Sequence, residues 1–300
     1  MDLKYLSNIN SPEDLKNYSK KDLKPISNEL REYITSTVNE IGGHLASTLG
    51  VVELTTALHY VYDAPKDKII WDTGHQAYAH KVLTGRFSSL KTIRKYKGLS
   101  GFLKRSESEY DVFGAGHAST SISAGLGIAS SRDLNNENFK VVSVIGDGAL
   151  TGGLAYEALN NAGNARKQLL VILNDNQMSI SPNVGAMRNY LMKISTNKYY
   201  NYIRKKIGNL PDIAYGKTLL RRMESSAKNF FLPRTVFEDL GFRYFGPIDG
   251  HDVNLLVNTL EKIKDLPGPV VLHTVTKKGK GIDYAEKDPI KYHGVKAKKI

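Results

Sequence analysis

The sequence lacks several features that would decide the class of this protein at once. It contains no cysteine, which excludes a disulfide framework and thiolate chemistry and favours a reducing compartment. No run of 18 apolar residues occurs, so no membrane span is predicted. The amino terminus, "MDLKYLSNINSPEDLKNYS", has no apolar stretch of the kind found in secretory signals. Internal repeats and low-complexity tracts are also missing, and we therefore expect a cytoplasmic globular protein.

The net charge of +12 is not spread evenly over the chain. Residues 193–234 carry ten Lys and Arg against Asp212 and Glu224, and residues 277–300 carry eight basic residues against three acidic ones. The remainder is close to neutral. We interpret the first segment as a solvated excursion, and we expect no nucleic-acid partner. A basic nucleic-acid-binding module built from both segments stays open as an alternative of another class.

Hydrophobic periodicity predicts strands that alternate with helices. Helices are predicted over 27–40, 46–62, 117–134, 153–163, 234–240 and 252–264. Strands are predicted over 67–71, 110–113, 140–145, 168–173, 242–245 and 270–276. This alternation is typical of an α/β fold with a doubly wound, mainly parallel sheet and helices on both faces. We expect one domain over residues 1–300, in which 177–234 forms a mobile or irregular excursion.

Polar, glycine-flanked stretches occur at or near the predicted strand ends. They read "DTGHQAY", "FGAGHAST", "IGDGALTGG", "LNDNQMSIS" and "TKKGKG". In open parallel sheets, ligands bind at the carboxyl ends of the strands. Five such stretches at one edge of the sheet indicate a binding site more strongly than any one of them alone.

The stretch "GAGHASTS" (114–121) fits neither of the common phosphate-binding motifs. It lacks the Gly-Lys-Ser/Thr of a P-loop and the third glycine of a dinucleotide fingerprint. What is left is a glycine turn that leads into a helix amino terminus, where free N–H groups favour an anion. Phosphate binding and simple close packing are equally compatible with this stretch.

The Gly-Asp-Gly of "VVSVIGDGALTGG" (141–153) is more informative because a second oxygen donor stands at the end of the next strand. Asp147 ends one predicted strand, and Asn176 comes directly after its neighbour in the chain. Neighbouring parallel strands would bring the carboxylate and the amide oxygen together. Oxygen ligands of this type, with a nearby main-chain carbonyl and diphosphate oxygens, suit an octahedral Mg²⁺ ion.

With these residues in view, "GDGALTGG" and "LNDNQMSIS" resemble the metal-binding motif of thiamine-diphosphate enzymes. The stretches "GGHLASTLGVVELTTALHYVY", "IIWDTGHQAYAHKVLTGR", "SEYDVFGAGHASTSISAGLGIA" and "TKKGKGIDYAEKDPIKYHG" resemble the 1-deoxy-D-xylulose-5-phosphate synthase family, whose members are transketolase-like. The similarity covers about residues 1 to 295. It implies a transferase that condenses pyruvate with D-glyceraldehyde 3-phosphate to 1-deoxy-D-xylulose 5-phosphate and carbon dioxide.

The resemblance also implies a role for individual residues. Magnesium is assigned to Asp147, Asn176 and the carbonyl of Met178. The remainder of the thiamine diphosphate site is assigned to Ser47, His75, Gly116, His117, Ala118, Gly146, Gly148 and Lys278. His44 and His293 are assigned to the reacting centre, where they orient groups or transfer protons. The other four histidines are expected to hydrogen-bond within the fold: His59, His80, His251 and His273.

Members of the family carry two further domains, a pyrimidine-binding one and a carboxyl-terminal one, and form homodimers. We expect this chain to supply only the magnesium and diphosphate half of the site and to be inactive alone. A second interpretation within the same enzyme class is the amino-terminal subunit of a split transketolase. The motifs "GHQAY" and "GHAST" favour the synthase.

Overall fold

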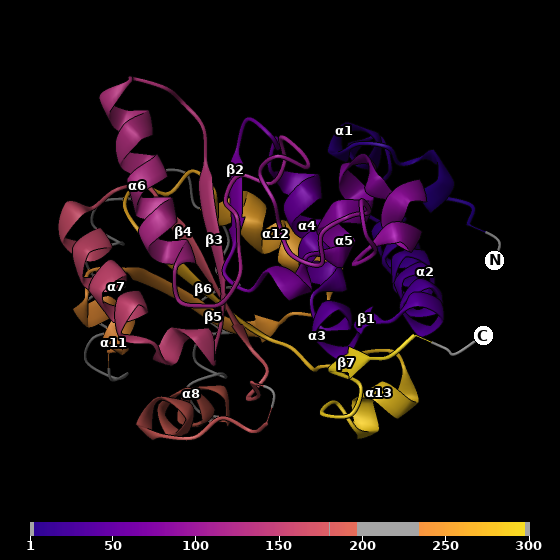
Figure 1. Ribbon diagram of the computed structural model, residues 1–300. Coiled ribbons are helices and arrows are strands. Elements are labelled where there is room, and N and C mark those ends of the chain that lie inside the picture. Colours follow the sequence, from indigo (N-terminus) through magenta and orange to yellow (C-terminus); the bar gives the residue numbers. More distant parts are fainter. Residues whose placement is uncertain (1–2, 180, 197–233, 298–300) are drawn as a thin grey trace.

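The centre of the computed structural model, which describes residues 3–179, 181–196 and 234–297, is a five-stranded parallel sheet in the order β2-β3-β4-β6-β5 (Figure 1). The strands are β2 (Lys68–Trp71), β3 (Val141–Gly146), β4 (Leu170–Asp175), β5 (Arg243–Asp249) and β6 (Val270–Val275). Runs of Val, Ile and Leu make up most of the buried strands β3, β4 and β6, as expected for a parallel sheet that is covered on both faces. The predicted fold class is confirmed.

Helices cover the two faces of the sheet (Figure 1). One face is covered by α4 (Val52–Val61) and α12 (Val253–Ile263), on which α2 (Leu23–Ile41) packs in turn, and the other by α6 (Ser121–Leu134), α7 (Gly153–Ala165) and α11 (Val236–Asp239). The chain moves from β2 through β3 to β4 by way of α6 and α7, and it returns from β5 to β6 by way of α12. Right-handed crossovers in opposite directions place their helices on opposite faces.

Short elements complete the described chain. They are η1 (Leu6–Asn8), α1 (Pro12–Lys16), β1 (Gly43–His44), α3 (Ala46–Leu49), η2 (Gly74–Gln76), α5 (Tyr78–Lys81), η3 (Val82–Arg86), η4 (Ser88–Thr92), η5 (Ala149–Thr151), α8 (Ala186–Thr196), α13 (Asp283–Lys287) and β7 (Gly294–Val295). The helix predicted over 46–62 is therefore two helices, α3 and α4, separated at Gly50 and Val51. Helix α6 lies close to β3 because Gly125 has no side chain: a Cβ there would lie 2.3 Å from Ser143 Oγ.

The strand predicted over 110–113 is wrong. This segment has no regular structure, because the side chain of Asp111 is buried and fixes it through contacts with other segments. Asp111 accepts hydrogen bonds from Arg86 and from the backbone N–H of Lys104. Side-chain contacts thus replace the ladder that a strand would require.

The predicted excursion over 177–234 is described only in part. Residues 186–196 form α8, so this stretch is not irregular; Leu191 and Ile194, three residues apart, are buried against the core on the α6 and α7 side. Residues 197–233, which carry most of the basic segment 193–234, lie outside the described residues. Among the described residues, no helix has the length and apolar character needed to cross a bilayer.

Candidate cofactor and metal site

Four of the polar stretches singled out in the sequence meet at the carboxyl edge of the sheet. They come after β2, β3, β4 and β6, which are neighbours in this order. The register places Gly146 opposite Asn174, and Asp175 opposite Val275. Asp147, Asn176 and Lys278 therefore leave the sheet at the same edge, as predicted. The fifth stretch, 113–120, precedes α6 and does not come after a strand.

The loop after β3 begins with a buried acid. Asp147 is only 3% exposed, and its carboxylate accepts a hydrogen bond of 3.0 Å from the N–H of Gly148. Burial, and next the charge of the neighbouring Asp175, raises the pKa of Asp147 well above its usual range. Two acids buried side by side favour a bound cation, because a cation offsets the repulsion between them.

Asn176 and Met178 lie in the loop after the neighbouring strand, β4. The side-chain oxygen of Asn176 accepts a hydrogen bond of 3.1 Å from the N–H of Met178, and Gln177 between them has a positive φ of 61°. This turn holds the segment after β4 close to Asp147. Asp147, Asp175 and Gln177 line one small hollow together. The Asp147 carboxylate and the Asn176 amide oxygen thus belong to neighbouring loops at one edge of the sheet, and oxygen donors of these types suit a magnesium ion.

Lys278, in the loop after β6, brings a positive charge to the same edge of the sheet. Its side chain is buried, and Nζ donates a hydrogen bond to the carbonyl of Ser179. Burial lowers the pKa of Lys278, whereas the nearby Asp147 raises it. An ammonium group held in this way can bind a phosphate oxygen beside a metal ion.

Two of the glycines that the resemblance assigns to the diphosphate have open space above them. A Cβ built on Gly116 or on Gly146 would meet no atom within 4 Å, whereas at Gly148 it would lie 2.3 Å from Ser179 Oγ. Asp72, directly after β2, accepts hydrogen bonds from the N–H groups of Ser119 (2.5 Å) and Ser121 (2.9 Å). The 116–118 turn is thereby tied to the edge of the sheet at the start of α6.

Four histidines from separate segments form one cluster. The ring centroid of His75 lies 5.0 Å from that of His44, 5.1 Å from that of His117 and 5.2 Å from that of His293. Burial, assisted by the neighbouring imidazoles, lowers the pKa of His44 to about 4 and that of His75 to about 2. The pKa of His293 is also lowered, first by burial and then by Lys278. These three rings are therefore neutral at pH 7 and can both donate and accept hydrogen bonds.

The two-stranded pairing of β1 with β7 brings His293 to His44. His44 lies opposite Gly294, and the N–H of Leu45 donates to the carbonyl of His293. Ser47 Oγ lies 3.1 Å from His293 Nδ1. The Nδ1 atoms of His44 and His75 are buried without a hydrogen-bond partner within the described ranges. These two ring nitrogens are available for a hydrogen bond to a bound ligand.

The remaining histidines bond within the fold, as predicted. His59 Nε2 lies 2.9 Å from His80 Nδ1, and His80 Nε2 lies 3.2 Å from an oxygen of Asp111. His273 bridges Asp175 and the hydroxyl of Tyr244, at 2.9 and 2.6 Å. His251 contacts Glu53. None of these four belongs to the cluster around His75.

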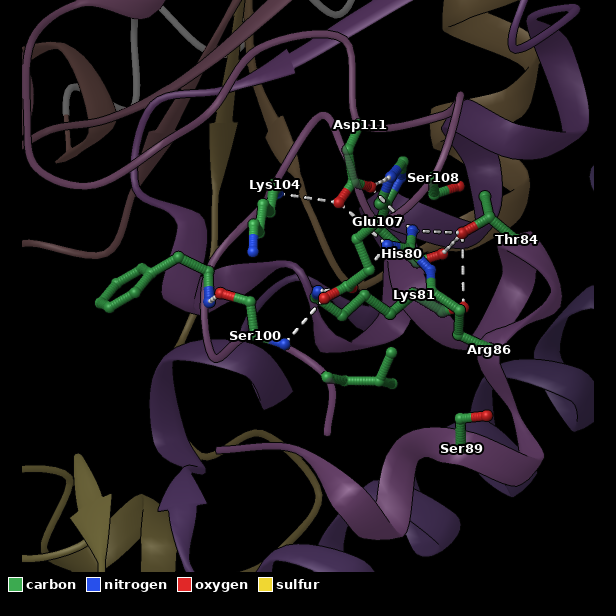
Figure 2. A network of polar contacts seen from close by, with 12 residues as sticks. His80, Lys81, Thr84, Arg86, Ser89, Ser100, Lys104, Glu107, Ser108 and Asp111 are labelled. Carbon is green, nitrogen blue, oxygen red and sulfur yellow. Dashed lines mark hydrogen bonds and ion pairs between the residues drawn. The ribbon is translucent and has the colours of Figure 1, made fainter. Parts of the chain in front are cut away.

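The sequence did not point to Phe102, whose ring centroid lies 5.9 Å from those of His44 and His117. An ionic network holds its loop (Figure 2). Glu107 accepts from the N–H of Ser100, and Asp111 accepts from the N–H of Lys104, so that both flanks of Phe102 are fixed. The network buries these acids against the cations Lys81 and Arg86, and Asp111 also contacts the imidazole of His80, whose pKa is lowered by burial.

Asp72 and Asp175 were also missed. Both are acids at strand ends in stretches that contain an identified residue, His75 in one case and Asn176 in the other, and that position was the available signal. Asp175 is 1% exposed; although burial disfavours its charge, the hydrogen bond from His273 holds its pKa below the usual range. It thus keeps a negative charge beside Asp147.

Comparison with known proteins agrees with this geometry. Residues 6–276 match the family model described as 1-deoxy-D-xylulose-5-phosphate synthase. The chain belongs to the 1-deoxy-D-xylulose-5-phosphate synthase family. It is 54% identical to the synthase of Alkaliphilus oremlandii over 299 residues, with 97% of this chain and 48% of the relative covered. The synthase of Caldanaerobacter subterraneus is also 54% identical, with 96% and 47% covered.

Solved transketolases share the fold of this synthase-family chain. The transketolase of Campylobacter jejuni superposes with a TM-score of 0.67 at 19% identity, over 93% of this chain and 41% of that one. The transketolase of Leishmania mexicana superposes with a TM-score of 0.63 at 17% identity, over 86% of this chain and 37% of that one. The chain spans about half the length of the curated relatives it matches.

Proposed function

We propose that this chain supplies the magnesium and diphosphate half of a thiamine diphosphate site in a 1-deoxy-D-xylulose-5-phosphate synthase. The reaction is the condensation of pyruvate with D-glyceraldehyde 3-phosphate, which gives 1-deoxy-D-xylulose 5-phosphate and carbon dioxide. The observation that carries the proposal is the buried acid Asp147 beside Asp175, with Lys278 at the same edge and open space over Gly116 and Gly146.

The donor set fits the cofactor. Asp147, Asn176 and the carbonyl of Met178 would hold Mg²⁺, and Lys278 with the 116–118 turn would hold the diphosphate. Gly146 and Gly148 would let phosphate oxygens approach the backbone. Bound thiamine diphosphate supplies an electron sink that allows a carbonyl carbon to act as a nucleophile, which side chains do poorly.

The chain's own residues would orient the reactants and move protons. His44 and His293 face the same cluster, and their lowered pKa values keep them neutral, so that each can accept a proton at one ring nitrogen and donate from the other. Ser47 fixes one nitrogen of His293. His75, which is buried, and Phe102, which is half-buried, would limit the access of water on this side of the site.

Several finer points belong to the same proposal. We infer a homodimer and a cytoplasmic location by analogy with the family. The alternative of a nucleic-acid-binding module receives no support from the family to which the chain belongs. A split transketolase is not favoured, because the similarity to transketolases is one of fold, whereas the relatives at 54% identity are synthases.

Isothermal titration calorimetry with thiamine diphosphate, with and without Mg²⁺, tests the proposal. We expect Mg²⁺-dependent binding to the chain and loss of this binding in Asp147→Ala. The matched control is Asp265→Ala, because the Asp265 side chain is 70% exposed and pairs with Lys140 at the opposite edge of the sheet. Binding that is independent of both Mg²⁺ and Asp147 would contradict the assignment.

A further inference from the structure

The loop that carries Lys278 is held in place by side chains from distant elements. We define the lysine loop as residues 277–281, directly after β6. The N–H of Lys277 donates to His251 Nε2 over 2.8 Å, and the carbonyl of Lys280 accepts from Arg31 Nε over 2.8 Å. The N–H of Gly279 donates to the carbonyl of Ala46. The loop is thus fixed at both ends and in the middle.

The two side chains that hold the ends of the lysine loop share one acid. Glu53, in α4, is 7% exposed; it pairs with Arg31 Nη2 through one oxygen and lies 3.2 Å from His251 Nδ1 through the other. Although burial disfavours its charge, the hydrogen bond from His251 and the charge of Arg31 keep the pKa of Glu53 below its usual range. A single buried carboxylate therefore orients both contacts.

These contacts determine which nitrogen of His251 carries the proton. Because the N–H of Lys277 donates to Nε2, that nitrogen is unprotonated, and the proton lies on Nδ1, from which it is donated to Glu53. The main chain of His251 is held as well: its N–H donates to the Asp249 carboxylate over 2.8 Å. Gly250 approaches β6 so closely that a Cβ would lie 2.4 Å from Thr276 Cγ2.

We propose that His251, oriented by Glu53, is a positioning residue for the diphosphate: it fixes the backbone of Lys277 and thereby the ammonium group of Lys278. This inference rests on the proposed function. Lys278 reaches from the lysine loop to the carbonyl of Ser179, in the segment after β4, and its charge faces Asp147. A small movement of Lys277 would displace the ammonium from this place. His251 itself is not among the residues assigned to the diphosphate or the metal; its contacts are with Glu53, Asp249 and Lys277.

Two substitutions separate this role from a merely structural one. In His251→Gln the amide oxygen can take about the place of Nε2 and accept from Lys277. In His251→Asn the amide nitrogen takes about the place of Nδ1, so that the contact with Glu53 is kept and the contact with Lys277 is lost. Both are polar side chains of lower volume than His, and each serves as the control of the other.

The test is calorimetric titration with thiamine diphosphate at saturating Mg²⁺, together with hydrogen exchange of the Lys277 amide. We expect His251→Asn to weaken binding about fivefold, which corresponds to one ordinary hydrogen bond, and His251→Gln to stay within about twofold of the unmodified chain. Exchange of the Lys277 amide should be faster in the Asn variant than in the Gln variant.

Equal affinities in the two variants would overturn the positioning role, as would equal exchange of the Lys277 amide. Failure of the unmodified chain to bind thiamine diphosphate would instead count against the proposed function. Even in that case the exchange measurement decides whether His251 holds the lysine loop, because it requires no ligand.

Discussion

Gly146 lies opposite Asn174 in the β3–β4 ladder, and this register sets Asp147 beside Asp175 at the carboxyl edge of the sheet. Each acid stands at the end of a buried strand, where neither is fully solvated. His273 stabilises the charge of Asp175, so the repulsion falls on Asp147. A site with this arrangement is costly when empty and gains stability when a cation binds.

Asp147→Asn should therefore stabilise the chain in the absence of ligands. The folded-state pKa of Asp147 lies above the unfolded value, so at pH 7 ionisation of this acid disfavours folding, and the neutral amide removes that cost. We expect the free energy of unfolding in urea to rise by about 2 kcal/mol. Addition of Mg²⁺ with thiamine diphosphate should stabilise the unmodified chain and not the variant. Lower stability of the variant without ligands would contradict this account.

Gly116→Val should affect binding and not folding. A Cβ at this position meets no atom within 4 Å, so the extra methyl groups would occupy the space assigned to the diphosphate. Affinity for thiamine diphosphate should fall at least about tenfold, while the melting temperature changes little. Gly127→Ala, in α6, is the control, because it also has open space but lies outside the candidate diphosphate site. Unchanged affinity in Gly116→Val would show that the ligand does not lie over this glycine.

Asp111→Ala should be the most destabilising of these changes. Its carboxylate is fully buried, accepts from both terminal nitrogens of Arg86 and from the N–H of Lys104, and contacts His80 (Figure 2). Removal takes away one of the two acids that pair with the buried Arg86, which then keeps its pair with Glu107, and it leaves the Lys104 N–H without this acceptor, at a cost of about 3–5 kcal/mol in urea unfolding. Glu261→Ala breaks the pair with Lys20, in which both side chains are 41% exposed, and should cost less than about 1 kcal/mol.

His75 should make stability depend on pH. Burial, together with the smaller effect of His44, lowers its pKa to about 2, below the unfolded value, so the unfolded chain takes up the proton first as pH falls. His75→Gln does not titrate. The stability of the unmodified chain relative to this variant should decrease by about 1 kcal/mol per pH unit between about pH 6 and about pH 5. Urea unfolding of both chains over this pH range measures the difference in their free energies of unfolding. A difference that does not change with pH would be inconsistent with a buried neutral ring.

Part of the fold and of the candidate site could be predicted without coordinates, because it depends on residues that are close together in the sequence. Runs such as "VVSVIG" and "LVILND" are buried strands wherever they pack, and the polar residues directly after them must leave the sheet at its carboxyl edge. That reasoning brought Asp147 and Asn176 to the same edge. It failed for 110–113, where a buried acid with long-range partners overrides strand propensity.

The sequence by itself determined the alternation of strands and helices and the family. It also determined that Asp147 and Asn176 follow two consecutive buried strands, because each of these features depends on residues that are close together in the chain. Only the tertiary structure decided which four of the eight histidines meet, and that Asp175 places a second negative charge beside Asp147. It also decided that Glu53 contacts His251, which is 198 positions away in the chain. The contact between Glu53 and His251, for example, depends on how α4 and α12 pack against each other. No residue spacing encodes that packing.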